Sequence, residues 1–190
     1  MKYVVLSILI IGITALSALS FEAEELNFTL QKERWEMEGL YYFANYDTIA
    51  VAQLIYFPIP VDSVCLPATL KKIAIQEGKD AKVTMKKQTQ NGFSFSLSLP
   101  AKSFCSVQII YTQALKGNYA KYIITSANAW GRPLPYAKYT LRKGKKVEIT
   151  ALPFPVQKRK KDSYTWEFYD FVPDKDIAVH FVAKQNNKEK

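Results

Sequence analysis

The sequence predicts an all-β protein, an antiparallel β-sandwich of about ten short strands that follows an N-terminal signal peptide. Apolar and polar residues alternate along most of the chain of 190 residues, which is the pattern of strands with one buried face. Aromatic residues make up 14% of the chain and glycine occurs only seven times, a composition that favours strands. Turn signals separate the alternating runs at the short intervals typical of sandwiches.

Residues 1–20 have the three parts of a secretory signal peptide. Lys2 supplies the basic start, an apolar run of about ten residues follows, and small residues complete the segment. The small-x-small ending predicts cleavage before Phe21, with Ser17/Ala18 as the alternative. The apolar run is shorter than the roughly 20 residues that span a bilayer, so we favour a cleaved signal over a membrane anchor. We therefore expect an exported protein, periplasmic or extracellular, without a transmembrane segment in its mature form.

The length of the mature chain predicts one domain. We assign residues 21–184 to a single β-sandwich domain and residues 185–190 to a polar tail. The net charge of +9 falls to +8 when the signal peptide, whose one charged residue is Lys2, is removed. Charge is uneven along this chain. Residues 21–48 carry seven acidic and two basic side chains, whereas residues 138–161 carry nine basic and one acidic.

The expected strands follow from the alternation, and glycine, asparagine and proline mark their ends. Asn91-Gly92 is the clearest hairpin signal, because both central residues of a type I′ turn need a positive φ. Residues 66–76 have apolar positions at helical spacing, but we assign the second half to a strand. The other expected strands are residues 26–31, 35–43, 49–57, 82–87, 93–99, 104–114, 119–126, 136–142, 147–152, 164–169 and 176–182.

Four pairs of motifs stand out between residues 24 and 182. They are YFAN at 42–45 with YFPIP at 56–60, LSLPA at 97–101 with IYTQ at 110–113, YIITS at 122–126 with WGRPL at 130–134, and WEFYDFVP at 166–173 with Asp176-Ile177. Together they resemble uncharacterised bacterial secreted or periplasmic β-sandwich domains of unknown function. The resemblance implies an exported bacterial sandwich, and it carries over no catalytic residue, cofactor or partner.

The residue types needed for common catalytic and metal sites are scarce. His180 is the only histidine, and its place on the last expected strand favours a rim position over a catalytic base. The Gly-x-Ser-x-Gly motif and the phosphate-loop motif do not occur. One histidine and two cysteines cannot form a four-ligand zinc site, and Asp174 and Asp176 are too few for calcium. We therefore expect a protein that is not an enzyme, with no catalytic residue, cofactor or metal.

Acid–base chemistry on a glycosidic bond would need a pair of carboxylates. Glu36 and Glu38 share one face of an expected strand, which is the usual place of carboxylates on the wet side of a half-buried sheet. Glu22, Glu24 and Glu25 are expected at a mobile new N-terminus. Neither group predicts a catalytic pair.

A sugar-stacking platform would need exposed aromatic rings. Trp35 and Trp166 lie in strand alternations and are predicted to be core residues. Trp130 precedes a glycine in a turn, where we favour packing under its own loop over exposure to a ligand. Tyr136 and Tyr139 are the further candidates for a platform.

Cys65 and Cys105 are the two cysteines of the chain. Two cysteines in an exported protein predict one intramolecular disulfide, formed in an oxidising compartment. The alternative is a pair of buried free thiols.

The densest cluster of charge in the chain is Lys158, Arg159, Lys160 and Lys161. Four adjacent like charges are not buried without partners, so we expect an exposed loop. Such a loop by itself helps to keep a basic protein soluble. The sharper hypothesis is an anion-binding patch, completed by basic residues of neighbouring strands and their turn, namely Lys138, Arg142, Lys143, Lys145 and Lys146.

These observations predict a binding or structural module of the cell envelope or the extracellular space. Its partner would be an envelope protein or an anionic surface glycolipid, and nucleic acid is the weaker hypothesis. The alternative function is that of a carbohydrate-binding or carbohydrate-active protein that uses exposed aromatic residues.

Overall fold

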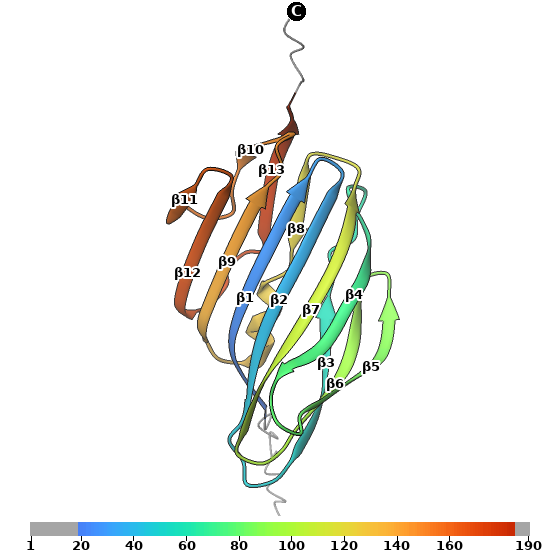
Figure 1. The fold of residues 1–190 in the computed structure, drawn as a ribbon, viewed down its shortest axis with the longest axis vertical. Helices are drawn as coiled ribbons and strands as arrows, with labels where there is room; N and C mark the ends of the chain where they lie inside the picture. Colours follow the sequence, from blue (N-terminus) through green and yellow to red (C-terminus); the bar gives the residue numbers. More distant parts are fainter. Residues whose placement is uncertain (1–18, 185–190) are drawn as a thin grey trace, which may run out of the picture.

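Thirteen β-strands and one short 3-10 helix, η1, make up most of residues 19–184, the part of the chain that this computed structural model describes (Figure 1). The elements, in chain order, are β1 (Leu19–Gln31), β2 (Arg34–Asn45), β3 (Val51–Pro58), β4 (Cys65–Glu77), β5 (Lys82–Thr89), β6 (Gly92–Leu99), β7 (Ser103–Leu115), β8 (Tyr119–Tyr122), η1 (Thr125–Trp130), β9 (Leu134–Lys143), β10 (Val147–Ala151), β11 (Lys158–Lys160), β12 (Ser163–Phe171) and β13 (Ile177–Ala183). The all-β prediction is confirmed, and the described residues contain thirteen strands where about ten were expected.

The large sheet has seven strands in the order β11-β12-β9-β1-β2-β7-β4. All its neighbours are antiparallel except β1 and β9, which run parallel, so the expected purely antiparallel arrangement is wrong at this one pair. The chain reaches β9 from β8 and η1, which belong to the second layer, and it therefore enters the large sheet without a hairpin from β1 (Figure 1). The second layer consists of two antiparallel three-stranded sheets, β10-β13-β8 and β3-β6-β5.

Aromatic rings fill much of the space between the layers. The ring of Tyr41 on β2 meets that of Phe57 on β3 at 5.7 Å between centroids. Phe28 on β1 packs against Tyr122 on β8 at 5.3 Å. The hydroxyls of Tyr41 and Tyr122 share a hydrogen bond of 2.7 Å. Each of these contacts joins the large sheet to one of the small sheets, so both small sheets cover the same face of the large one.

The predicted core tryptophans lie in the core. Trp35 is fully buried, and Trp166 is 1% exposed. The indole Nε1–H of Trp166 donates a hydrogen bond of 3.0 Å to the Pro155 carbonyl. Tyr139, a candidate for a sugar platform, is also fully buried, so that role is excluded for it.

Three segments differ from the expected assignments. Residues 66–76 lie entirely in β4, because the segment pairs with β7 along its length. The second half is a strand, as expected, and the first half, which had helical spacing, is also a strand. Lys158–Lys160 form the short edge strand β11 rather than a loop, because they pair with β12. The strand expected over residues 119–126 ends at Tyr122, and η1 takes up its last residues.

The predicted disulfide between Cys65 and Cys105 is wrong. Both cysteines are free and buried. Cys65 lies opposite Leu115 at one end of β7, whereas Cys105 lies opposite Phe43 near the other end of that strand. At about 3.3 Å per residue, the two sites are roughly 33 Å apart along the sheet, and a disulfide needs Cα atoms within about 7 Å. Burial raises the pKa of both thiols to about 11, so they are also poorly reactive.

The predicted signal peptide and polar tail fall almost wholly outside the described residues. Only Leu19 and Ser20 belong to the described part, where they begin β1 and pair with Asn45 and Ala44 of β2. Cleavage before Phe21 would remove these two strand residues, whereas the alternative cut at Ser17/Ala18 would keep β1 whole. Export itself stays a prediction.

Candidate functional site

The nine basic residues of the predicted patch are spread over β9, the turn after it, β11 and the turn to β12. Lys145 and Lys146 lie in the turn between β9 and β10. Lys158, Arg159 and Lys160 lie on β11, at the edge of the large sheet, and Lys161 follows in the turn to β12. Lys143 ends β9.

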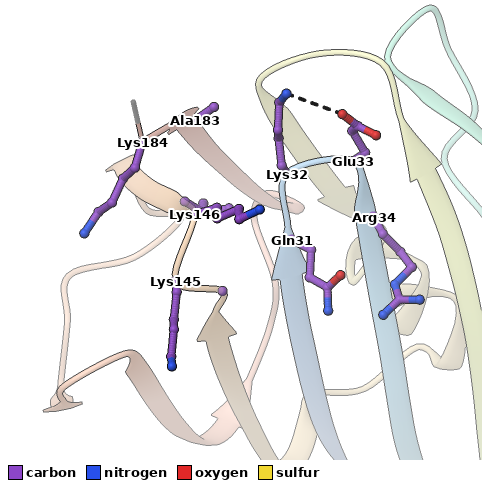
Figure 2. A pocket seen from close by; sticks show the side chains of 10 residues that line it. Gln31, Lys32, Glu33, Arg34, Lys145, Lys146, Ala183 and Lys184 are labelled. Carbon is purple, nitrogen blue, oxygen red and sulfur yellow. Dashed lines mark ion pairs between the residues drawn. The ribbon is translucent and has the colours of Figure 1, made fainter. Parts of the chain in front are cut away.

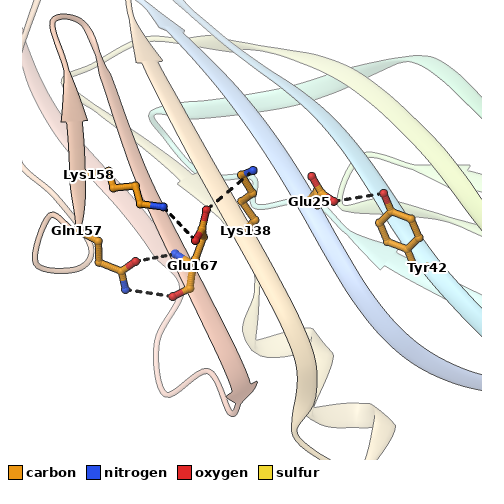
Figure 3. A network of polar contacts seen from close by, with 6 residues as sticks. All are labelled: Glu25, Tyr42, Lys138, Gln157, Lys158 and Glu167. Atoms are coloured by element: carbon orange, nitrogen blue, oxygen red, sulfur yellow. Dashed lines mark hydrogen bonds and ion pairs between the residues drawn. The ribbon is translucent and has the colours of Figure 1, made fainter.

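The side chain of Lys158 is held on the outer face of the large sheet (Figure 3). Its Nζ lies 3.3 Å from a carboxylate oxygen of Glu167 on β12, and Lys138 Nζ lies 4.0 Å from the other oxygen. The Gln157 amide bonds to the backbone N–H and carbonyl of Glu167. Glu167 therefore neutralises part of the charge that was expected to be available to a ligand.

Two more residues of the predicted patch have partners in the fold. The Arg159 guanidinium lies over the ring of Tyr164 at 5.3 Å, a cation–π contact. Lys143 Nζ lies 2.7 Å from the carboxylate of Asp162. Its hydrogen bond lowers the pKa of that carboxyl group. Three basic side chains around β11, those of Lys158, Arg159 and Lys143, therefore have partners in the fold.

A second set of basic residues lines an open groove of about 740 Å³ at the end of the molecule where β1 turns into β2 and β9 turns into β10 (Figure 2). Glu33 is the one acidic residue in its lining, and its carboxylate lies 3.5 Å from Lys32 Nζ. The unpaired excess is positive, and like charges around a concavity add their potentials. We call this site the basic groove and define it by Lys32, Arg34, Lys145, Lys146 and Lys184.

Backbone hydrogen bonds hold the three segments of the basic groove together. The Gly144 N–H donates to the Leu30 carbonyl at 2.7 Å, which ties the β9–β10 turn to the end of β1. The Lys184 N–H donates to the Lys146 carbonyl at 3.0 Å, which ties the end of β13 to the same turn. The backbones of the lysines are therefore fixed, while their side chains reach solvent.

The sequence analysis found Lys145 and Lys146 but missed Lys32, Arg34 and Lys184. The cause is the parallel pairing of β1 with β9, in which Leu30 lies opposite Lys143. Parallel neighbours end at the same edge of a sheet, whereas a hairpin sends them to opposite edges. The turn after β1 and the turn after β9 thus meet, although more than a hundred residues separate them in the chain.

A buried carboxyl group forms a separate polar site between the layers. Glu24 is 4% exposed, so the expectation of a mobile N-terminal segment is wrong for this residue. It lies inside β1, opposite Tyr41 on β2 and Ala137 on β9. Its carboxyl group accepts a hydrogen bond of 2.6 Å from the Tyr139 hydroxyl. Burial raises the pKa of Glu24 to about 7.

The exposed aromatic rings lie elsewhere. Tyr169 is 72% exposed on β12, and its ring lies 5.4 Å from that of Tyr136 on β9. Trp130 is half-buried and packs against Phe21 and Phe43, with centroid distances of 5.6 and 5.7 Å. It therefore sits under its own corner, as the sequence predicted. Of the residues predicted for a sugar-stacking platform, Tyr136 is the one that stays a candidate, and Tyr169 is its neighbour there.

The described residues offer little for metal or acid–base chemistry beyond Glu24. Within residues 19–184, no three His, Cys, Asp or Glu side chains gather closely enough to hold a metal ion. His180 is exposed on β13, with its ring 5.9 Å from that of Tyr119. In the same part of the chain, no helix has the length and apolar character needed to cross a membrane.

Comparisons with solved structures show which folds this one is similar to. A chain from Legionella pneumophila, named as a candidate nutrient-binding protein, matches with a TM-score of 0.57 and 10% identity over 87% of this chain and 67% of that chain. An M1 zinc metallopeptidase from Deinococcus radiodurans matches with a TM-score of 0.49 and 8% identity over 86% of this chain and 42% of that one. Yeast LTA4 hydrolase matches with a TM-score of 0.47 and 8% identity over 86% and 29%. No protein-family model and no curated protein matches the sequence.

The expectation that the protein is not an enzyme is corrected by these matches. A part of each of the two enzymes, the metallopeptidase and the hydrolase, aligns with most of this chain. The chain spans less than half of either enzyme, and the likeness concerns the fold alone.

Proposed function

We propose that the protein is an exported β-sandwich binding module, and that its basic groove takes the phosphate-bearing headgroup of an anionic surface glycolipid. The observation that carries the proposal is the set of five basic side chains around one open groove with a single acidic residue. The Legionella chain of similar fold, named as a candidate nutrient-binding protein, supports a binding role. The predicted signal peptide supports a place in the envelope or outside the cell.

The chemistry of the groove suits phosphate groups. A guanidinium such as that of Arg34 matches two oxygens of a phosphate at once, and the lysines act as point charges around it. A nucleic acid is less well matched, because no aromatic side chain lines the described groove for a base to stack on. An acidic envelope protein is the alternative partner.

Replacing Lys32, Lys145, Lys146 and Lys184 together with glutamine is expected to abolish binding to vesicles that carry a diphosphorylated glycolipid. Each basic residue near an anionic surface contributes about 1 kcal/mol, so four correspond to roughly a thousandfold loss of affinity. Cosedimentation with phosphatidylcholine vesicles, with and without the glycolipid, measures this. Binding of the wild-type protein should weaken steeply between about 0.1 M and 1 M salt, as the Debye length falls.

A matched control removes four lysines from β4 and β5 instead. Lys71, Lys72, Lys86 and Lys87 are exposed there, and their replacement with glutamine changes the net charge equally. This control is expected to bind like the wild type. Equal loss in both variants would show that only net charge matters, and failure of the wild type to bind any vesicle would favour an acidic protein partner.

Carbohydrate binding is the second candidate function, favoured by the ring pair of Tyr136 and Tyr169 on the outer face of the large sheet. Aromatic rings with one exposed face stack on sugars through their apolar surfaces. Binding of uncharged glycans that is lost in Tyr169→Ala would support this candidate, and it would leave the basic groove without a part in it.

A further inference from the structure

A small cavity of about 60 Å³ lies between the layers, beside β3 and η1. Its lining includes Glu24, which carries a carboxyl group, and Tyr41 and Tyr122, whose hydroxyls share a hydrogen bond. Aromatic rings form most of the remaining lining, including those of Phe21, Phe57 and Trp130. The lining also includes Tyr56 and Ser126, which are exposed, so the cavity reaches the surface between β3 and η1.

The charge of Glu24 is uncompensated by the fold. None of the ion pairs among the described residues involves it. The titratable groups that face it are tyrosines, Tyr139 on β9, Tyr41 on β2 and Tyr122 on β8. Burial raises the pKa of all three hydroxyls well above the ordinary value, so they stay neutral. Glu24 is thus the group in this cavity that changes charge near neutral pH.

We propose that this cavity binds the ammonium end of a primary amine. An ammonium group would supply the positive charge that the buried carboxylate lacks, and its N–H groups would donate to the carboxylate and to the tyrosine oxygens. Phe21, Tyr41 and Trp130 contribute aromatic rings to the lining, and the faces of such rings attract cations. A cavity of this volume has room for more than one water molecule, so we expect it to take an ammonium group, which is of similar size, with one or two attached carbons. The rest of the ligand would extend past Tyr56 and Ser126.

Titration with ethylammonium chloride, followed by calorimetry and by amide chemical shifts, tests this inference. At pH 8 the wild-type protein is expected to bind ethylammonium saturably, in a background of sodium chloride at equal ionic strength. Tetramethylammonium has no N–H to donate and is expected not to bind. With the pKa of Glu24 near 7, the ionised fraction falls from about 90% at pH 8 to about 10% at pH 6, so binding should weaken about tenfold.

Two variants remove the site in different ways. Glu24→Gln removes the charge and keeps an acceptor for Tyr139, and Ala127→Leu fills the cavity from η1 while Glu24 stays. Both are expected to lose ethylammonium binding. The matched control is Glu25→Gln, because Glu25 lies on the outer face of the large sheet, 3.4 Å from the Tyr42 hydroxyl (Figure 3). This variant is expected to bind ethylammonium like the wild type.

The circular dichroism spectrum of each variant serves as the check on folding. No saturable binding by the wild type at pH 8, or equal binding by folded Glu24→Gln, would overturn the inference. Equal affinity for tetramethylammonium would overturn it as well, because binding would then not depend on hydrogen bonds from the ammonium N–H groups to the carboxylate and the hydroxyls.

Discussion

Trp166→Ala is expected to lower the free energy of unfolding by about 3 to 5 kcal/mol, the range for deletion of a large buried aromatic side chain. Trp166 is 1% exposed on β12, and its ring meets that of Phe154 at 6.4 Å. The substitution leaves a void and also removes the donor that the Pro155 carbonyl uses. Unfolding in urea, followed by circular dichroism, measures the loss.

Tyr169→Ala is the matched control, because it removes an aromatic ring from the same strand at a position that is 72% exposed. Exposed substitutions of this kind change stability by about 0.5 kcal/mol or less. Similar losses in the two variants would contradict the assignment of Trp166 to the core.

Glu24→Gln is expected to alter how stability depends on pH. The pKa of Glu24 is about 7 in the folded protein and 4.5 as an ordinary glutamate. Between these values the folded state retains the proton that the unfolded state has lost, so the free energy of unfolding of the wild type falls as pH rises. The fall is complete above about pH 7 and amounts to roughly 3 kcal/mol. Glu24→Gln lacks this dependence.

Urea unfolding at pH 4, 6 and 8 provides the measurement. The stability of the wild type, minus that of Glu24→Gln, should drop by about 3 kcal/mol from pH 4 to pH 8. Glu25→Gln should run parallel to the wild type, because Glu25 lies on the outer face. A constant difference between the wild type and Glu24→Gln would show that the Glu24 carboxyl group titrates as in water.

The alternation of apolar and polar residues was sufficient to predict the all-β class and the burial of Trp35 and Trp166. It was not sufficient for the order of strands, because side-chain period is a local property and pairing is not. The β1–β9 pair joins residues 23–30 to residues 136–143 in parallel, and nothing in either run specifies its partner. For the same reason, the sequence did not predict the strand register that places Cys65 and Cys105 near opposite ends of β7.

Glu24 carried a signal that the sequence analysis did not use. It lies two residues before Leu26, on the face shared by Leu26, Phe28 and Leu30, so the alternation itself places it inward. The strand was expected to begin at residue 26, so Glu24 was assigned to a mobile N-terminal segment. The Tyr139 hydroxyl on β9, which the parallel pair brings alongside, donates a hydrogen bond to this carboxyl group and so lowers the cost of its burial.

The most direct test of the basic groove is a chemical-shift titration of the backbone amides with a soluble, bisphosphorylated glucosamine disaccharide. The proposed function predicts that the shifts concentrate at residues 31–34, 144–147 and 183–184, the segments that line the groove. They should disappear in the variant with Lys32, Lys145, Lys146 and Lys184 changed to glutamine. Shifts confined to residues 158–161, or spread over exposed lysines such as Lys71 and Lys86, would contradict it.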